Sequence, residues 1–268
     1  MDSGQAASQP SAAATTTSSS SIGQDESAVM NSMYQVDWVQ KLLMQIKECL
    51  RQNSDWLGID PSKPQTILDY ACGNGTVSLG LLDSFPLAKF RGIDILDSQV
   101  QLYNEEASKV LGPDHRSRMY AIPGDLNDPE KTPVLSQPEW FTFDCAIMSF
   151  GLHHVDDPID FLRLLGARVK PGATLVIVDW VRDTKANPPR VYDQARERKY
   201  NPSNMLPVPM GKVWPGFSED DIREDYTLAG FTAVEVRIWP EKIDLPQQAN
   251  FGGRSILYVS KATVPLPP

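Results

Sequence analysis

Residues 67–80, ILDYACGNGTVSLG, place a short apolar segment directly before a turn of small residues and a stretch that can begin a helix. Residues with little or no side chain let a ligand approach the backbone closely. A second apolar segment ends at Asp94, about 20 residues beyond Gly73, where a carboxylate can accept hydrogen bonds from both hydroxyls of a ribose. The stretch therefore predicts an adenosine-containing ligand; the alternative is that the glycines serve only a tight turn.

Apolar segments and helical patterns alternate along the rest of the chain. This order predicts right-handed crossovers and a mainly parallel sheet with helices on both faces, an α/β fold of the doubly wound type. Strands are expected at residues 66–70, 90–95, 119–122, 143–150, 173–180, 233–239 and 255–261. Helices are expected at residues 30–50, at 77–82, from about 98, after Asp157 and after Ser218.

Two of these helices carry signals at both ends. Asp157 can cap the first, and the Pro-Gly pair at 171–172 is expected to stop it. Ser218, with an aspartate three residues later, resembles a capping box, and Gly230 is expected to end that helix.

The composition is that of an acidic globular chain. Its 268 residues are 41% hydrophobic and carry a formal net charge of −9. Binding to nucleic acid requires a basic face, so this charge predicts no nucleic-acid partner. No apolar run reaches the roughly 18–20 residues of a membrane span. The three cysteines are widely spaced, which predicts neither a disulfide framework nor a zinc site, and no metal is expected.

Two segments depart from the globular pattern. Residues 1–27 are rich in Ser, Thr and Ala and are expected to be disordered, because they cannot bury enough surface to offset their ordering entropy. They resemble neither a secretory signal nor an Arg-rich presequence, so the ordered domain is expected at 28–268 and the protein in the cytoplasm. Residues 183–216, rich in Pro and aromatic side chains, are longer than an ordinary connection and predict a lid or substrate segment.

Two adenosine-containing ligands compete for the turn at 71–75. A dinucleotide motif requires G-x-G-x-x-G, which brings a helix N-terminus to a pyrophosphate. Reading from Gly73 places Ser78 at the third glycine, and reading from Ala71 does not complete the pattern either. S-adenosylmethionine has no phosphate but carries a sulfonium cation, with which an acidic residue such as Asp69 is compatible. The turn therefore favours S-adenosylmethionine over NAD.

Six landmarks in order extend this interpretation over most of the chain, from Ile67 to Lys261. They are ILDYACGNG, GIDI, PGDLND, FDCAIMSFGLHHVDDP, RVKPGATLVIVD and FSEDDIREDYTLAGF. In this order they resemble the motifs of class I S-adenosylmethionine-dependent methyltransferases, in the style of the small-molecule branch that includes the ubiquinone and menaquinone methyltransferases. The resemblance implies a seven-stranded, mainly parallel Rossmann-like sheet with an antiparallel last strand. Ala71 departs from the family pattern, which has a glycine at this position.

The resemblance also assigns roles around the cofactor. It implies that the turn after the first strand borders the methionine part, that Asp94 binds the ribose and that Asp125 lies at the adenine edge. Asp125 alternatively serves only as a turn residue. The implied cofactor-binding residues are Asp69, Ala71, Gly73, Asn74, Gly75, Asp94, Ile95, Asp125, Leu126 and Ser149.

Candidate catalytic and substrate-binding residues follow from their places in the pattern. His153 and His154 lie just beyond the fourth strand, where a histidine can take a proton from an acceptor atom; the alternative is that they cap a helix or pack under the loop. Aromatic side chains are candidates for contact with the substrate, with packing as the alternative. These are Tyr34, Trp180, Tyr192 and Trp214.

The predicted activity is transfer of the sulfonium methyl group to an O, N, S or C atom of a small organic molecule. The low-complexity tail favours an enzyme of specialised metabolism. Two alternatives are a nicotinamide-dependent Rossmann oxidoreductase and a methyltransferase-like binding or regulatory protein without catalysis.

Overall fold

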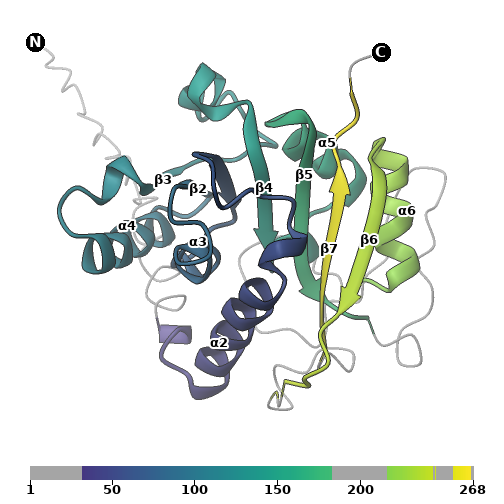
Figure 1. Ribbon diagram of the computed structural model, residues 1–268, viewed down its shortest axis with the longest axis horizontal. Coiled ribbons are helices and arrows are strands. Elements are labelled where there is room, and N and C mark those ends of the chain that lie inside the picture. Colours follow the sequence, from purple (N-terminus) through teal and green to yellow (C-terminus); the bar gives the residue numbers. More distant parts are fainter. Residues whose placement is uncertain (1–31, 183–215, 244, 246–255, 267–268) are drawn as a thin grey trace, which may run out of the picture.

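A single twisted sheet forms the centre of the protein (Figure 1). The computed structural model describes residues 32–182, 216–243, 245 and 256–266. Within them, seven strands are arranged in the order β3-β2-β1-β4-β5-β7-β6. The strands are β1 (Thr66–Tyr70), β2 (Lys89–Asp94), β3 (Met119–Pro123), β4 (Phe143–Ser149), β5 (Val169–Trp180), β6 (Thr232–Ile238) and β7 (Leu257–Thr263).

The strand order has two consequences. Strands β1 to β5 pair in parallel, whereas β7 lies antiparallel between β5 and β6. The arrowheads of β4 and β5 accordingly point the opposite way to that of β7 in Figure 1. Because β2 lies on one side of β1 and β4 on the other, the order reverses beside β1, and ligands bind at the carboxyl ends of strands at such a point. The predicted parallel sheet with an antiparallel last strand is confirmed.

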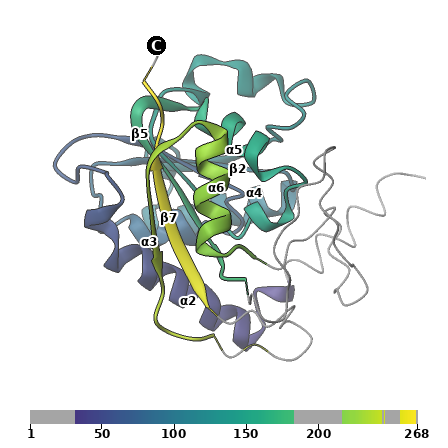
Figure 2. The same ribbon diagram turned by 90° about the vertical axis from the view of Figure 1, so that its right-hand side faces the viewer.

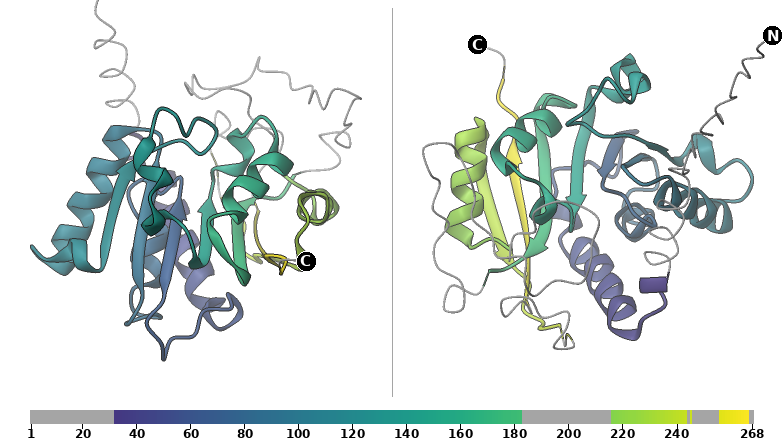
Figure 3. Two further views of the ribbon diagram at one scale, coloured as in Figure 1. Left: turned by 90° about the horizontal axis from the view of Figure 1, so that it is seen from above. Right: turned by 180° about the vertical axis from the view of Figure 1, so that it is seen from behind.

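Helices cover both faces of the sheet, and each face has its own apolar core (Figures 2 and 3). One core includes side chains of α2, α3 and α4, and the other includes side chains of α5 and α6. The helices are α2 (Asp37–Gln52), α3 (Thr76–Leu81), α4 (Asp97–Leu111), α5 (Pro158–Gly166) and α6 (Glu219–Ala229). Short 3-10 turns are η1 (Ser54–Trp56), η2 (His115–Ser117), η3 (Pro133–Ser136), η4 (Pro138–Trp140) and η5 (Leu152–His154).

Helix ends follow the predicted signals, with two exceptions. Asp157 accepts backbone hydrogen bonds at the start of α5, and α6 has the predicted capping box at Ser218 and the left-handed Gly230 at its end. The stop predicted at 171–172 is wrong, because α5 ends at Gly166 and those residues belong to β5. The helix predicted at 30–50 is interrupted: Ser32 and Met33 are helical, a turn follows, and α2 begins at Asp37 after Val36, which has an extended backbone.

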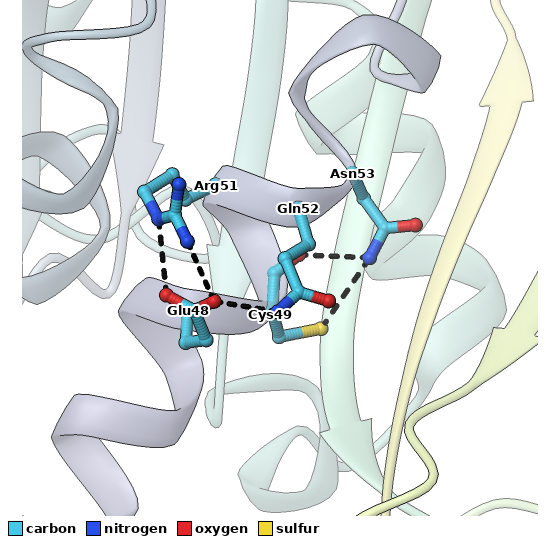
Figure 4. Close-up of polar contacts among 5 residues, drawn as sticks. All are labelled: Glu48, Cys49, Arg51, Gln52 and Asn53. Atoms are coloured by element: carbon cyan, nitrogen blue, oxygen red, sulfur yellow. Dashed lines mark hydrogen bonds and ion pairs between the residues drawn. The ribbon is translucent and has the colours of Figure 1, made fainter.

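Side-chain hydrogen bonds gather at the carboxyl end of α2 (Figure 4), and a further one joins this end to the sheet. Asn53 donates from Nδ2 to the carbonyl oxygen of Cys49 at 2.8 Å, and its Oδ1 accepts from Arg237 of β6 at 2.9 Å. On the exposed side, Glu48 accepts from both Arg51 and Gln52. These contacts fix the axis of α2, whose inner face reaches the ligand end of the sheet.

Several predictions concern residues that the structure does not describe. They are the disordered tail at 1–27, nearly all of the insert at 183–216, and with it Tyr192 and Trp214. Among the helices that are described, none is both long and apolar enough to cross a bilayer.

Candidate functional site

A cavity of about 820 Å³ opens at the carboxyl ends of β1, β2 and β4, where the strand order reverses. Its walls come from the turn after β1, the first turn of α4, the loops after β3 and β4, the inner face of α2 and the start of α5. Ligand sites of small-molecule proteins are commonly about 300–1,000 Å³ in volume. Position and size together make this cavity the candidate active site.

The turn after β1 forms the floor of the cavity. Gly73 and Gly75 have φ values of +50° and +83°, in the left-handed region that glycine adopts freely. A Cβ at Gly73 would lie 2.8 Å from the hydroxyl oxygen of Tyr34, so a side chain at this position would collide with it. Gly73 and Asn74 line the cavity, whereas Gly75 lies beneath it against Tyr103 and begins α3.

Two non-glycine residues beside the cavity also have left-handed backbones. Ala71 has φ +55° and Phe150 has φ +57°, and they follow the neighbouring strands β1 and β4. Both line the cavity, as does Ser149 at the end of β4. Backbone conformations of this kind cost about 1–3 kcal/mol and cluster at functional sites. Ala71, which replaces the glycine of the family pattern, therefore keeps the left-handed backbone at the cost of strain in the cavity wall.

Asp94 is a buried carboxylate in the cavity wall. Its side chain is 8% exposed and accepts backbone hydrogen bonds from Gly73 at 2.9 Å and Leu96 at 3.0 Å. Burial raises its pKa, and the two backbone donors oppose that rise. Ile95 follows it with a side chain 46% exposed at the cavity wall. The carboxylate is thus presented at the cavity by the backbone of the glycine turn itself.

The loop after β3 contributes Asp125 to the cavity wall. One oxygen of its carboxylate accepts the backbone N–H of Asn127 at 2.8 Å, as in an Asx turn. The residue therefore stabilises the turn and also borders the cavity. Leu126, predicted beside the adenine, is 2% exposed, is absent from the cavity wall and donates its backbone N–H to the hydroxyl of Tyr70.

Asp69 lies behind the cavity rather than in its wall. It is fully buried, and its Oδ2 accepts the hydroxyl of Ser78 at 2.7 Å and the backbone N–H of the same residue at 3.2 Å. Its Oδ1 has no hydrogen-bond partner among the described residues. Burial raises the pKa of this carboxyl to about 7. The residue holds the start of α3 against β1 instead of bordering the cavity as predicted.

The two candidate histidines have different surroundings. His153 is 5% exposed, and its backbone N–H and ring Nδ1 contact the two carboxylate oxygens of Asp179 at 3.1 and 2.7 Å. His154 is half-buried, lines the cavity and stacks obliquely on His153 with ring centroids 4.1 Å apart. Asp179 at the end of β5 therefore fixes the turn that presents His154 to the cavity.

Two of the aromatic candidates also have different surroundings. Tyr34 lines the cavity from the turn before α2, and its hydroxyl donates to Oε1 of Gln99 at 2.7 Å. Trp180 is 5% exposed, is absent from the cavity wall and packs edge-on against Phe150 at a centroid distance of 4.8 Å. The sequence interpretation missed Gln99; the only available signal was its place in the helix after Asp94.

The residues present fit S-adenosylmethionine better than a dinucleotide. Among the described residues of the cavity wall there is no Lys or Arg to face a pyrophosphate, but there are several aspartates. Asp94 can accept both ribose hydroxyls, and the acidic wall suits a sulfonium cation. Within the described part of the chain, no three His, Cys, Asp or Glu side chains gather in a way that could hold a metal ion.

Comparison with known proteins supports the same assignment. A tRNA U34 carboxymethyltransferase from Pseudoalteromonas translucida is 28% identical over 177 residues, which cover 62% of this chain and 48% of that protein. A ubiquinone/menaquinone biosynthesis C-methyltransferase from Haemophilus ducreyi is 30% identical over 122 residues, which cover 44% and 42%. The chain spans about half the length of the curated relatives that it matches.

The fold has close counterparts among solved structures. An O-methyltransferase family protein from Burkholderia thailandensis superposes with a TM-score of 0.59 at 15% identity, over 93% of this chain and 63% of that one. A model of the family described as "methyltransferase domain" matches residues 33–236. The predicted fold and methyltransferase family are confirmed. The chain belongs to the methyltransferase domain family.

Proposed function

We propose that the protein is an S-adenosylmethionine-dependent methyltransferase that acts on a small organic molecule. The observation that carries this proposal is the buried carboxylate of Asp94, held by the backbone of the glycine turn at the floor of the cavity. When bound, S-adenosylmethionine supplies an activated methyl group on a sulfonium leaving group. The chain's part is to hold the cofactor and acceptor in line, because alignment supplies much of the acceleration.

The cavity wall favours a small, partly apolar acceptor. Beyond the glycine turn it continues along Leu42, Leu43 and Ile46 of α2. These side chains offer an apolar surface without hydrogen-bonding groups, as is common in sites for organic ligands. A polyanionic acceptor would meet aspartates there and no Lys or Arg among the described wall residues, so RNA and DNA are disfavoured.

We assign His154 the role of general base where the acceptor must lose a proton. It is the histidine that lines the cavity, and the contacts of Asp179 with its neighbour fix its position. Proton transfer by a positioned side chain commonly contributes a factor of about 100 to 10,000. Acceptors that react without losing a proton would not need this group.

Ligand-dependent melting tests the proposed cofactor. S-adenosylhomocysteine at about 100 times its dissociation constant should raise the melting temperature by several degrees, because it stabilises only the folded state. NADH at the same concentration should leave the melting temperature unchanged. The opposite pattern would favour the oxidoreductase alternative and contradict the proposal.

Replacing His154 with alanine should lower kcat for proton-losing acceptors by about 100-fold or more. The dissociation constant of S-adenosylhomocysteine should stay within about twofold. The assay follows labelled methyl transfer to a panel of phenols, amines, thiols and quinols. His115→Ala, remote from the cavity wall, is the matched control. Equal kcat in both variants would remove His154 from catalysis, and cofactor binding without transfer to any acceptor would favour a non-catalytic protein.

A further inference from the structure

The side chain of Gln99 has a polar group that finds no partner among the described residues. It lies in the first turn of α4, is 2% exposed and lines the cavity. Its Oε1 accepts the hydroxyl of Tyr34 at 2.7 Å. Its Nε2 is buried and contacts no acceptor among the described residues. Buried donors are nearly always paired in folded proteins, because an unpaired donor loses its hydration without compensation.

The hydroxyl of Tyr34 determines how this carboxamide is turned. In this pair the hydroxyl of Tyr34 is the donor and Oε1 of Gln99 is the acceptor. Burial raises the pKa of Tyr34, which keeps this hydroxyl protonated as a donor. With Oε1 engaged by Tyr34, the two N–H groups of Nε2 remain for another acceptor, and Gln99 itself lines the cavity.

The carboxamide lies at the same corner of the cavity as the ribose carboxylate. A Cβ built on Gly73 would be 2.8 Å from the hydroxyl of Tyr34 and 3.8 Å from Oε1 of Gln99. The backbone N–H of Gly73 donates in turn to Oδ2 of Asp94. Tyr34, Gly73, Gln99 and Asp94 are therefore neighbours in the cavity wall, where Asp94 has a carboxylate acceptor and Gln99 has an unpartnered donor.

We propose that Gln99 is a further binding residue for S-adenosylmethionine, which donates a hydrogen bond from Nε2 to an oxygen of the cofactor. The acceptor is either a ribose hydroxyl oxygen or the carboxylate of the amino-acid part, both of which accept N–H donors. Tyr34 is the positioning residue, because it turns the carboxamide. This assignment rests on the proposed function, since it takes S-adenosylmethionine as the ligand of the cavity.

Calorimetric titration of four proteins tests the assignment. Wild type, Gln99→Leu, Tyr34→Phe and the double variant are each titrated with S-adenosylhomocysteine and with 5′-methylthioadenosine, which keeps the ribose but lacks the amino-acid part. Gln99→Leu should weaken S-adenosylhomocysteine binding about five- to tenfold, the range for one buried hydrogen bond. Tyr34→Phe should weaken it in the wild-type background but change little when Gln99 is already leucine.

Each outcome decides between the alternatives. A loss of affinity for both ligands places the acceptor on the ribose, and a loss for S-adenosylhomocysteine alone places it on the carboxylate. Unchanged affinity in Gln99→Leu overturns the role of Gln99, and additive losses in the double variant overturn the positioning role of Tyr34. If wild type does not bind S-adenosylhomocysteine, the proposed function itself fails. Gln101→Leu, exposed on the same helix, is the matched control and should bind like wild type.

Discussion

Replacing Asp94 with alanine is expected to weaken binding of S-adenosylhomocysteine by at least about 100-fold, because a hydrogen bond to a charged group is worth roughly 1.5–3 kcal/mol and two ribose hydroxyls lose theirs. The variant also removes the acceptor for the backbone N–H groups of Gly73 and Leu96. The floor of the cavity would therefore lose both a ligand contact and the group that fixes its backbone. Asp94→Asn, which keeps one acceptor oxygen, should show an intermediate loss.

Titration calorimetry of wild type, Asp94→Ala and Asp94→Asn measures these affinities directly. Asp97→Asn is the matched control, because Asp97 is an exposed aspartate three residues later, at the start of α4. It should bind with the affinity of wild type. Affinity of Asp94→Ala within threefold of wild type would contradict the proposed ribose contact and, with it, the placement of the cofactor in this cavity.

The stability of the ligand-free protein is expected to fall between pH 5 and pH 8, and Asp69 is expected to cause much of the fall. Burial raises the pKa of this carboxyl from 3.8 to about 7. In this range the carboxyl of Asp69 keeps its proton in the folded state and has lost it in the unfolded state. Its contribution to the free energy of unfolding is therefore complete below about pH 4 and is lost as the pH rises through 7. The loss between pH 5 and pH 8 is roughly 3 kcal/mol.

Urea unfolding at several pH values measures this contribution. In Asp69→Asn, the amide oxygen can still accept from Ser78, and the titration of the carboxyl is absent. The difference in unfolding free energy between pH 5 and pH 8 should shrink by the roughly 3 kcal/mol assigned to the carboxyl. Asp55→Asn, at an exposed site, should keep the wild-type dependence. An unchanged slope in Asp69→Asn would show that the buried carboxyl does not titrate in this range.

Local sequence patterns were sufficient to predict most strands of the sheet. The strand at Thr66–Tyr70 and the capping box at Ser218 depend on neighbouring residues, and both lie where the sequence predicts them. The Pro-Gly pair at 171–172 failed as a helix stop because pairing between strands decides its conformation. Val169 already pairs with Phe143, and the register then shifts before Thr174 pairs with Cys145.

The candidate site, too, was predictable from local patterns only in part. The position of Asp94 follows from its spacing to the glycine turn, and it lines the cavity. The contact of Tyr34 with Gln99 joins residues 65 positions apart and leaves no local pattern. Asp69 and Trp180 lie at or near the ends of strands, as predicted, but their side chains pack into the interior. Side chains alternate between the two faces of a strand, and only the packed structure shows which of them reach the cavity.

The antiparallel β7 has a consequence for how the protein is made. Its residues lie between β5 and β6, so they join two strands that cannot pair with each other directly. A nascent chain that has emerged from the ribosome only as far as β6 exposes two unpaired strand edges, and such edges template aggregation. The described cavity wall ends at Phe161 and is synthesised well before Leu257. The residues that bind the ligand would therefore be present during translation before β7 completes the sheet.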